Sequence, residues 1–187
     1  GTIRSDLLHA DAVARAVTFT ALGLGDATAN ALGLAAATGL TGGAGDDRLE
    51  NAGVVDLNPH ARSIGQSVSV ALGGAAIGEA NADALAEAAG IEGGSGEDTI
   101  VNTGEISLDA LASTTARSIG ATAVGYSLGQ ANANATASVT GLAGGDQDDT
   151  MVNAESGHIG IVATADTVAT SVSITVAGAA DGEARTL

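Results

Sequence analysis

Three glycine-rich stretches hold the residues of this sequence that are best suited to chemistry. They are Gly42–Glu50, Gly93–Val101 and Gly144–Val152, which read GGAGDDRLE, GGSGEDTIV and GGDQDDTMV and follow one another at intervals of 51 residues. Glycines permit a tight turn whose carbonyl groups point together, and a carboxylate beside them adds charge. Such a turn offers oxygen ligands to a hard divalent cation. The same residue types also suit a solvent-facing turn without metal.

The first two stretches match the nonapeptide Gly-Gly-x-Gly-x-Asp-x-hydrophobic-x, and so resemble the repeats-in-toxin (RTX) calcium-binding repeats of large bacterial secreted proteins. The third departs at its fourth position, where Gln147 replaces glycine. The resemblance implies a Ca²⁺ cofactor with Asp47, Asp98 and Asp149 as carboxylate ligands and the glycine-rich backbone as carbonyl donor. That family stacks its nonapeptides consecutively, whereas this sequence has one per 51 residues. Calcium binding therefore requires that motif lie above motif.

The spacing of 51 residues extends well beyond these stretches. Asn30, Asn81 and Asn132 each lie within an Ala-Asn-Ala triplet at this interval. A second series with the same interval follows each glycine-rich stretch and consists of Asn51, Asn102 and Asn153. Stacked asparagines hydrogen-bond amide to amide, so this second series predicts a ladder through adjacent rungs. A single coil of 51 residues would climb about 4.8 Å per repeat, and several shorter coils per repeat are the alternative.

An alternating pattern defines the buried face of one strand. In Ala80–Gly90 every second residue is alanine, while the intervening positions carry asparagine, aspartate, leucine and glutamate. The third repeat keeps the alanines over 131–137 and places Thr and Ser between them. Alanine favours helices, but strict alternation with Thr, Ser and Val indicates a strand whose small face is buried.

Two further strands are predicted in each repeat. One follows the repeat asparagine, as in residues 106–112, and the other is Ser67–Leu72, which matches Ser171–Val176. We therefore predict an all-β, parallel β-helix-like β-solenoid with a thin Ala-rich core, against the alternative of an antiparallel sandwich. Residues 1–187 form one repeat array, with a partial repeat over 1–40, repeats at about 41–91 and 92–142, and a partial repeat over 143–187.

Charged residues between the constant positions are less regular. The Ala-Arg pairs that contain Arg15, Arg62 and Arg117 are 47 and 55 residues apart, which predicts insertions on one side of the repeat. We expect these arginines to face water at a strand end or to pair with carboxylates. We interpret the histidines as unrelated to the repeat and as surface residues; they are His9, His60 and His158.

Composition excludes several partners. The net charge is −16, from 22 acidic residues against six arginines. Nucleic acid and anionic membranes are therefore poor partners, since binding them requires clustered cations. The sequence has no cysteine and no apolar run near the roughly 20 residues that span a membrane. We expect an extracellular or bacterial cell-surface location, no membrane insertion, and an excerpt from a longer chain.

These observations favour a structural role over catalysis. We expect a repeat module of an adhesin stalk, matrix fibre or filament subunit, whose partners are neighbouring repeats, other copies, or surface and matrix ligands. Residues Ile100–Ile106 also resemble coils of autotransporter and haemagglutinin-type β-helices. A polysaccharide-acting β-helix is the enzymatic alternative, yet no unlike catalytic groups interrupt the repeat, and we predict no catalytic residue. An ice-binding face would need threonine rows, whereas Thr136 has Leu85 and Leu34 at its equivalent positions.

Overall fold

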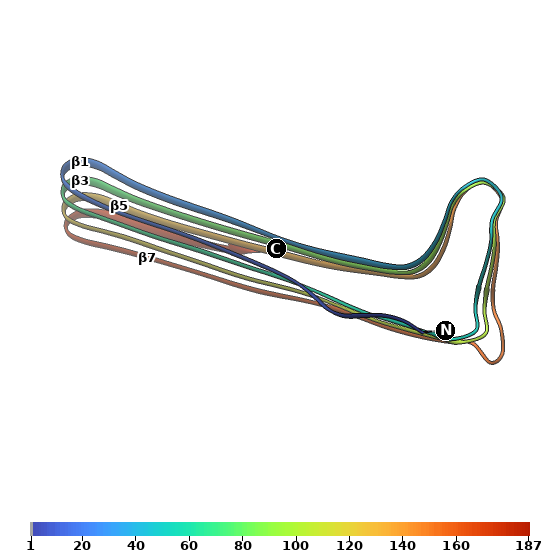
Figure 1. The fold of residues 1–187 in the computed structure, drawn as a ribbon. Coiled ribbons are helices and arrows are strands. Elements are labelled where there is room, and N and C mark those ends of the chain that lie inside the picture. Colours follow the sequence, from blue (N-terminus) through green and yellow to red (C-terminus); the bar gives the residue numbers. More distant parts are fainter. Residues whose placement is uncertain (1) are drawn as a thin grey trace.

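The chain folds into a stack of parallel strands. The structure is a computed structural model that describes residues 2–187, with side chains from residue 9 onward. A four-stranded parallel sheet has the order β1-β3-β5-β7, and a three-stranded parallel sheet has the order β2-β4-β6 (Figure 1). The prediction of an all-β solenoid is confirmed. The strands are β1 (Thr2–Ala44), β2 (Arg48–Asn51), β3 (Val54–Ser95), β4 (Thr99–Asn102), β5 (Glu105–Asp146), β6 (Thr150–Asn153) and β7 (His158–Thr186).

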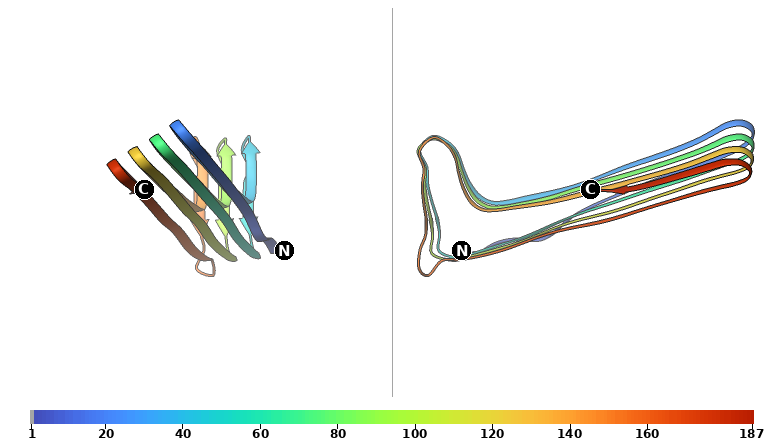
Figure 2. Two further views of the ribbon diagram at one scale, coloured as in Figure 1. Left: turned by 90° about the vertical axis from the view of Figure 1, so that its left-hand side faces the viewer. Right: turned by 180° about the vertical axis from the view of Figure 1, so that it is seen from behind.

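Each repeat makes one long coil. From Val54 the chain runs along β3, reverses at Gly73 and Gly74, and returns in the opposite direction, so that a single long strand supplies two layers (Figures 1 and 2). It then bends away, passes through the glycine-rich turn, and descends through β4 to the next coil. Each residue of β3 from Val54 to Ser95 that pairs with β5 does so 51 positions further along the chain. The alternative of several shorter coils per repeat is therefore wrong.

Small residues hold the two layers of each coil close together. A Cβ added at Gly65 would lie 2.5 Å from the carbonyl oxygen of Asn81 in the opposite layer, so no larger residue fits. Ser63 donates a hydrogen bond from Oγ to the carbonyl of Ala31 at 2.8 Å, and Ser118 does the same to Gly78 at 2.7 Å. The second lone pair of a backbone carbonyl is free for such a bond after the ladder bond has formed. The interior here is thus partly polar, and serine hydroxyls join the two layers.

Large apolar residues fill only the other end of the coil. There the short strand adds a third wall, and the walls stand too far apart for alanine to fill the space between them. The fully buried side chains that do so are Val55, Leu57, Ile91, Ile100, Ile106 and Leu108. The predicted Ala-rich core is confirmed for the two-layer part: Ala80, Ala82, Ala84, Ala86 and Ala88 are all buried.

The register departs from 51 residues at two places. Ala154–Gly157 adds two residues at one corner, so β5 pairs with β7 at an interval of 53, and β1 shifts against β3 between Ser5 and Leu8. Both departures lie on the side of the repeat where insertions were predicted, but the Ala-Arg pairs from which they were inferred are not equivalent positions. Arg15 and Arg117 lie in one column with Gln66 between them, whereas Arg62 lies beside Asp11 in another column. Similar Ala-Arg pairs thus occupy different positions of the coil.

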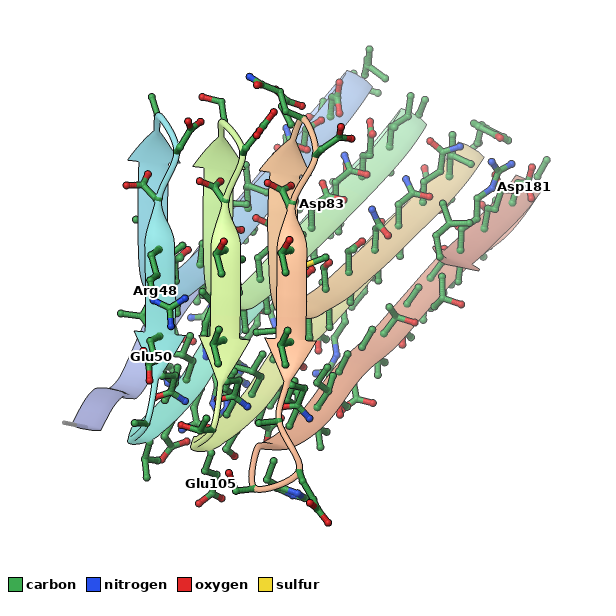
Figure 3. The ribbon with its side chains drawn as sticks, turned by 90° about the vertical axis from the view of Figure 1, so that its right-hand side faces the viewer. Arg48, Glu50, Asp83, Glu105 and Asp181 are labelled. Atoms are coloured by element: carbon green, nitrogen blue, oxygen red, sulfur yellow. The ribbon has the colours of Figure 1, made fainter. Side chains whose placement is uncertain are left out.

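The short strands β2, β4 and β6 were not predicted from the sequence. Each has four residues, and each follows a glycine-rich stretch that dominates the local pattern. Figure 3 shows the three strands side by side in front of the long ones, with Arg48 and Glu50 labelled on β2. The side chains of Arg48 and Glu50 form an exposed ion pair, with 3.4 Å between nitrogen and oxygen. Over the described residues the chain has no helix long and apolar enough to cross a membrane.

Candidate functional site

The glycine-rich turns lie one above another where each long strand ends and each short strand begins. Gly43 and Gly45 have φ values of 99° and 106°, and the second and fourth positions of the other two turns are also left-handed. Only glycine adopts this conformation without strain, which accounts for the motif. Gln147 takes φ 84° in the third turn and is the one non-glycine residue with positive φ in the described chain. The structure therefore brings the three motifs together, as calcium binding would require.

Across each pair of neighbouring turns, one aspartate oxygen accepts a hydrogen bond from the backbone. The backbone N–H of Asp47 donates to Oδ1 of Asp98 at 2.8 Å, and the N–H of Asp98 donates to Oδ1 of Asp149 at 2.9 Å. Asp98 and Asp149 thus each accept a hydrogen bond from the coil before. Such charge-assisted bonds are stronger than neutral ones, and they fix the register between neighbouring turns.

The other carboxylate oxygen points inward and is left without a partner. Asp98 is 1 % exposed, and the Oδ2 atoms of Asp47 and Asp98 are buried without a hydrogen bond from the described residues. The first glycine of each motif makes room for this oxygen: a Cβ on Gly42 would lie 2.9 Å from Oδ2 of Asp47, and one on Gly93 would overlap Oδ2 of Asp98. A buried charged oxygen without a partner is costly unless a cation or a proton neutralises it.

Within the part of the chain that the structure describes, like charges stack directly only in these turns. Throughout the paired residues of both sheets, an acidic residue always lies beside an uncharged or basic one; Asp83, for example, lies between Leu32 and Asn134. In the turns, by contrast, carboxylate follows carboxylate in two adjacent columns. The outer column is exposed, and Glu97 donates its backbone N–H to Oδ1 of Asp46 at 2.9 Å. Stacked carboxylates repel one another, so this pattern favours a bound cation at the turns.

The oxygen atoms available at the turns determine which cation could bind there. The described residues contain no group of three or more His, Cys, Asp or Glu side chains placed to hold a metal. A cation between two turns would therefore take one inner carboxylate oxygen from each turn and complete its shell with turn carbonyls and water. Ca²⁺ accepts this mixture of six to eight oxygens more readily than Mg²⁺ or Zn²⁺ does. The assignment of Asp47, Asp98 and Asp149 as ligands remains a prediction.

The asparagine ladder lies beside the turns and has a structural role. The side-chain amide of Asn51 donates to Oδ1 of Asn102 at 2.8 Å, and Asn102 donates in the same way to Asn153 at 2.8 Å. Asn102 is completely buried. The predicted ladder is confirmed. A second, more exposed ladder runs through Asn30, Asn81 and Asn132 and donates in the opposite direction along the stack.

The histidines and arginines outside the glycine-rich stretches lie in the long strands. His9 and His60 are 51 residues apart, pair in the sheet, and have ring centroids 5.5 Å apart. The interpretation of all histidines as unrelated to the repeat is therefore wrong for this pair, and their spacing alone could have revealed it. Arg15, Arg62 and Arg117 are exposed, as one of the two predicted alternatives required, although they lie within the long strands and not at a strand end. The ion pairs of the described side chains involve other arginines.

Comparison with known proteins adds no relative. No protein-family model matches the chain, and neither a curated protein nor a solved structure is significantly similar to it.

Proposed function

We propose that this chain is a structural repeat module of a large extracellular or cell-surface bacterial protein, such as an adhesin stalk, a matrix fibre or a filament subunit. The observation that carries the proposal is the uniform stacking: constant positions of the sequence lie in continuous columns, and hydrogen-bonded ladders run the length of the array. In a stack of this kind each coil contacts only its neighbours, so repeats can be added to extend length without a new fold.

Calcium at the glycine-aspartate turns would stabilise this module. Two features support it: the partnerless inner oxygens of Asp47 and Asp98, and the carboxylates stacked in the turns alone. A cation there would neutralise the buried charge and offset the repulsion between coils. The net charge of −16 suits an environment rich in divalent cations and disfavours nucleic acid as a partner.

Single-molecule stretching between the two ends of the chain tests the mechanical role. If the coils are independent load-bearing units, the chain extends in equal steps, and each step releases 51 residues. At about 3.6 Å per residue each step lengthens the chain by roughly 180 Å. Asn102→Ala removes amide bonds on both sides of its coil, so it should lower the rupture force of one step without changing the step length.

Two results would contradict the structural proposal. The first is extension in one event without a 51-residue interval, because the coils would then not act as separate units. The second is release of reducing ends from polysaccharides by the purified chain, which would favour the enzymatic alternative. Circular dichroism of the parent chain and of Asn102→Ala establishes in both experiments that the sample is folded.

A further inference from the structure

The two outward faces of the long coil differ sharply in chemistry. On the returning layer, amides and acids, including the asparagine ladder and the labelled Asp83 and Asp181 (Figure 3), are mixed with exposed leucines such as Leu32 and Leu34. The first layer carries four neighbouring columns of mainly β-branched apolar residues, which we call the apolar face. Its members are Val13, Ile64, Thr115 and Val168; Arg15, Gln66, Arg117 and Thr170; Val17, Val68, Ile119 and Val172; and Phe19, Val70, Ala121 and Ile174.

The apolar face lies open to solvent. In the end coils Val17 is 77 % exposed and Phe19 is 68 % exposed, and in the inner coils Ile119 is 40 % exposed, while Ile64 and Val68 are half-buried between their neighbours in the sheet. A contiguous apolar surface of this kind marks an interaction site more often than scattered apolar residues do. A shallow hollow between Gln66, Val68, Arg117 and Ile119 adds relief to an otherwise flat sheet.

We propose that the apolar face binds the same face of a second copy of this chain. This inference goes beyond the proposed structural role and does not depend on calcium. Charge selects the partner: the four columns contain two arginines and no acid in a chain with 22 acids, so two copies that meet here keep their carboxylates apart. The outward face of the returning layer would instead bring carboxylates of the two copies together, such as those of Glu79, Asp83 and Glu87.

A twofold axis parallel to the stack fits this face. Placed over the column of Val17, the axis sets Val17 against the partner's Val17 and reverses the order of the columns on either side. Arg15 of one copy then lies over Phe19 of the other, because both are one column from the axis. An arginine over an aromatic ring is a favourable contact that needs no carboxylate. This contact forms in the first coil, and in the other coils the same axis sets Gln66, Arg117 and Thr170 against the small or apolar residues Val70, Ala121 and Ile174.

The size of the face predicts weak, reversible association. Four columns span roughly 20 Å along the strands and four coils span roughly 19 Å along the stack. The product is about 400 Å² per copy, or about 800 Å² for the pair, which is below the standard interface of about 1,600 Å². We therefore expect dissociation constants of about 10–500 µM, in the range of transient complexes. Each added coil would enlarge the face in proportion.

Sedimentation equilibrium of the purified chain in chelator, from about 10 µM to 1 mM, tests the proposal. We expect the average mass to rise toward that of a dimer, and more so in 500 mM than in 50 mM NaCl, because salt screens the repulsion between acidic copies. Val17→Glu should weaken association at least tenfold, since it places two carboxylates opposite each other at the axis. Leu34→Glu is the matched control: Leu34 is 56 % exposed in the same coil but lies on the opposite face, so association should persist.

Three outcomes would overturn the proposal. A monomer throughout the concentration range would assign the face to a different polypeptide. Association that survives Val17→Glu would indicate another route, such as pairing of the outer edges of β1 and β7. Equal weakening by Val17→Glu and Leu34→Glu would show that added charge, and not this face, controls association. Circular dichroism melts of both variants establish that each is folded.

Discussion

At the scale of single residues, the aspartate of each turn has two separate tasks. Oδ1 of Asp98 accepts the backbone N–H of Asp47 and so joins two coils, while Oδ2 is buried without a partner. The hydrogen bond to Oδ1 joins the coils with or without calcium. Oδ2 is the atom that is available to bind a cation. Substitutions that affect the two oxygens differently can therefore separate structure from binding.

Asp98→Ala removes the structural oxygen, so it should destabilise the fold relative to Asp98→Asn, which also removes the buried charge but keeps an acceptor, whether or not calcium is present. The N–H of Asp47 loses its acceptor, and an unsatisfied buried donor costs about 1–3 kcal/mol. Urea titrations in chelator measure this loss. Asp109→Asn, which removes an exposed acid of the same coil, is the control and should be nearly neutral. Equal effects of Asp98→Ala and Asp98→Asn would contradict the assigned role of Oδ1.

Gly65→Ala tests the close approach of the two layers. Its Cβ would meet the Asn81 carbonyl at 2.5 Å, so the layers must move apart, and we expect a loss of about 1–3 kcal/mol in the free energy of unfolding. Gly160→Ala is the matched control, because the nearest atom to its Cβ would be 4.0 Å away. Thermal melts should show a large shift for the first and almost none for the second. Similar shifts would mean that the layers are not in close contact.

At the scale of the strand, alternation determines which face is buried. Ala84→Leu inserts a large side chain between two closely spaced layers and should cost about 1–3 kcal/mol, whereas Asp83→Asn on the exposed face should be nearly neutral. Chemical denaturation of the two variants measures both effects. Comparable losses of stability in the two variants would show that the buried and exposed faces of the strand are assigned wrongly.

The sequence predicted those parts of the coil in which the same residue types recur from repeat to repeat. It did not predict the parts in which the residue types vary. The alanine face and the asparagine ladder follow from spacing alone, because every member repeats at 51 residues. The column of Arg62 could not be found this way, since outward charged positions tolerate substitution and Ala-Arg occurs in unrelated columns. The inward direction of the Asp98 carboxylate depends on the offset between stacked turns and on Gly93, and this is a property of the assembled stack.

At the scale of the whole molecule, stacking creates an electrostatic problem that grows with length. In the sheets, the problem is avoided by interleaving: each acid has an uncharged or basic neighbour in the coils on either side. In the turns it is not avoided, and every further coil would add two more carboxylates to the stacked columns. Repulsion along the array therefore concentrates at one edge, next to the buried oxygens that lack partners.

Calcium should consequently stabilise the folded array through these turns. Binding to the folded state alone contributes about 2.7 kcal/mol at a calcium concentration one hundred times Kd. For a chain of this length that corresponds to a rise of roughly 5–10 °C in Tm. Thermal melts in calcium, in magnesium at equal ionic strength and in chelator measure the effect and separate binding from screening. Asp98→Asn sharpens the test, because the amide keeps an acceptor for the N–H of Asp47 but removes the buried charge. We expect this variant to be at least as stable as the parent chain in chelator and to gain less from calcium, while Asp109→Asn keeps the full gain. Equal melting temperatures of the parent chain in calcium and chelator would mean that the turns are held by hydrogen bonds and glycine geometry alone.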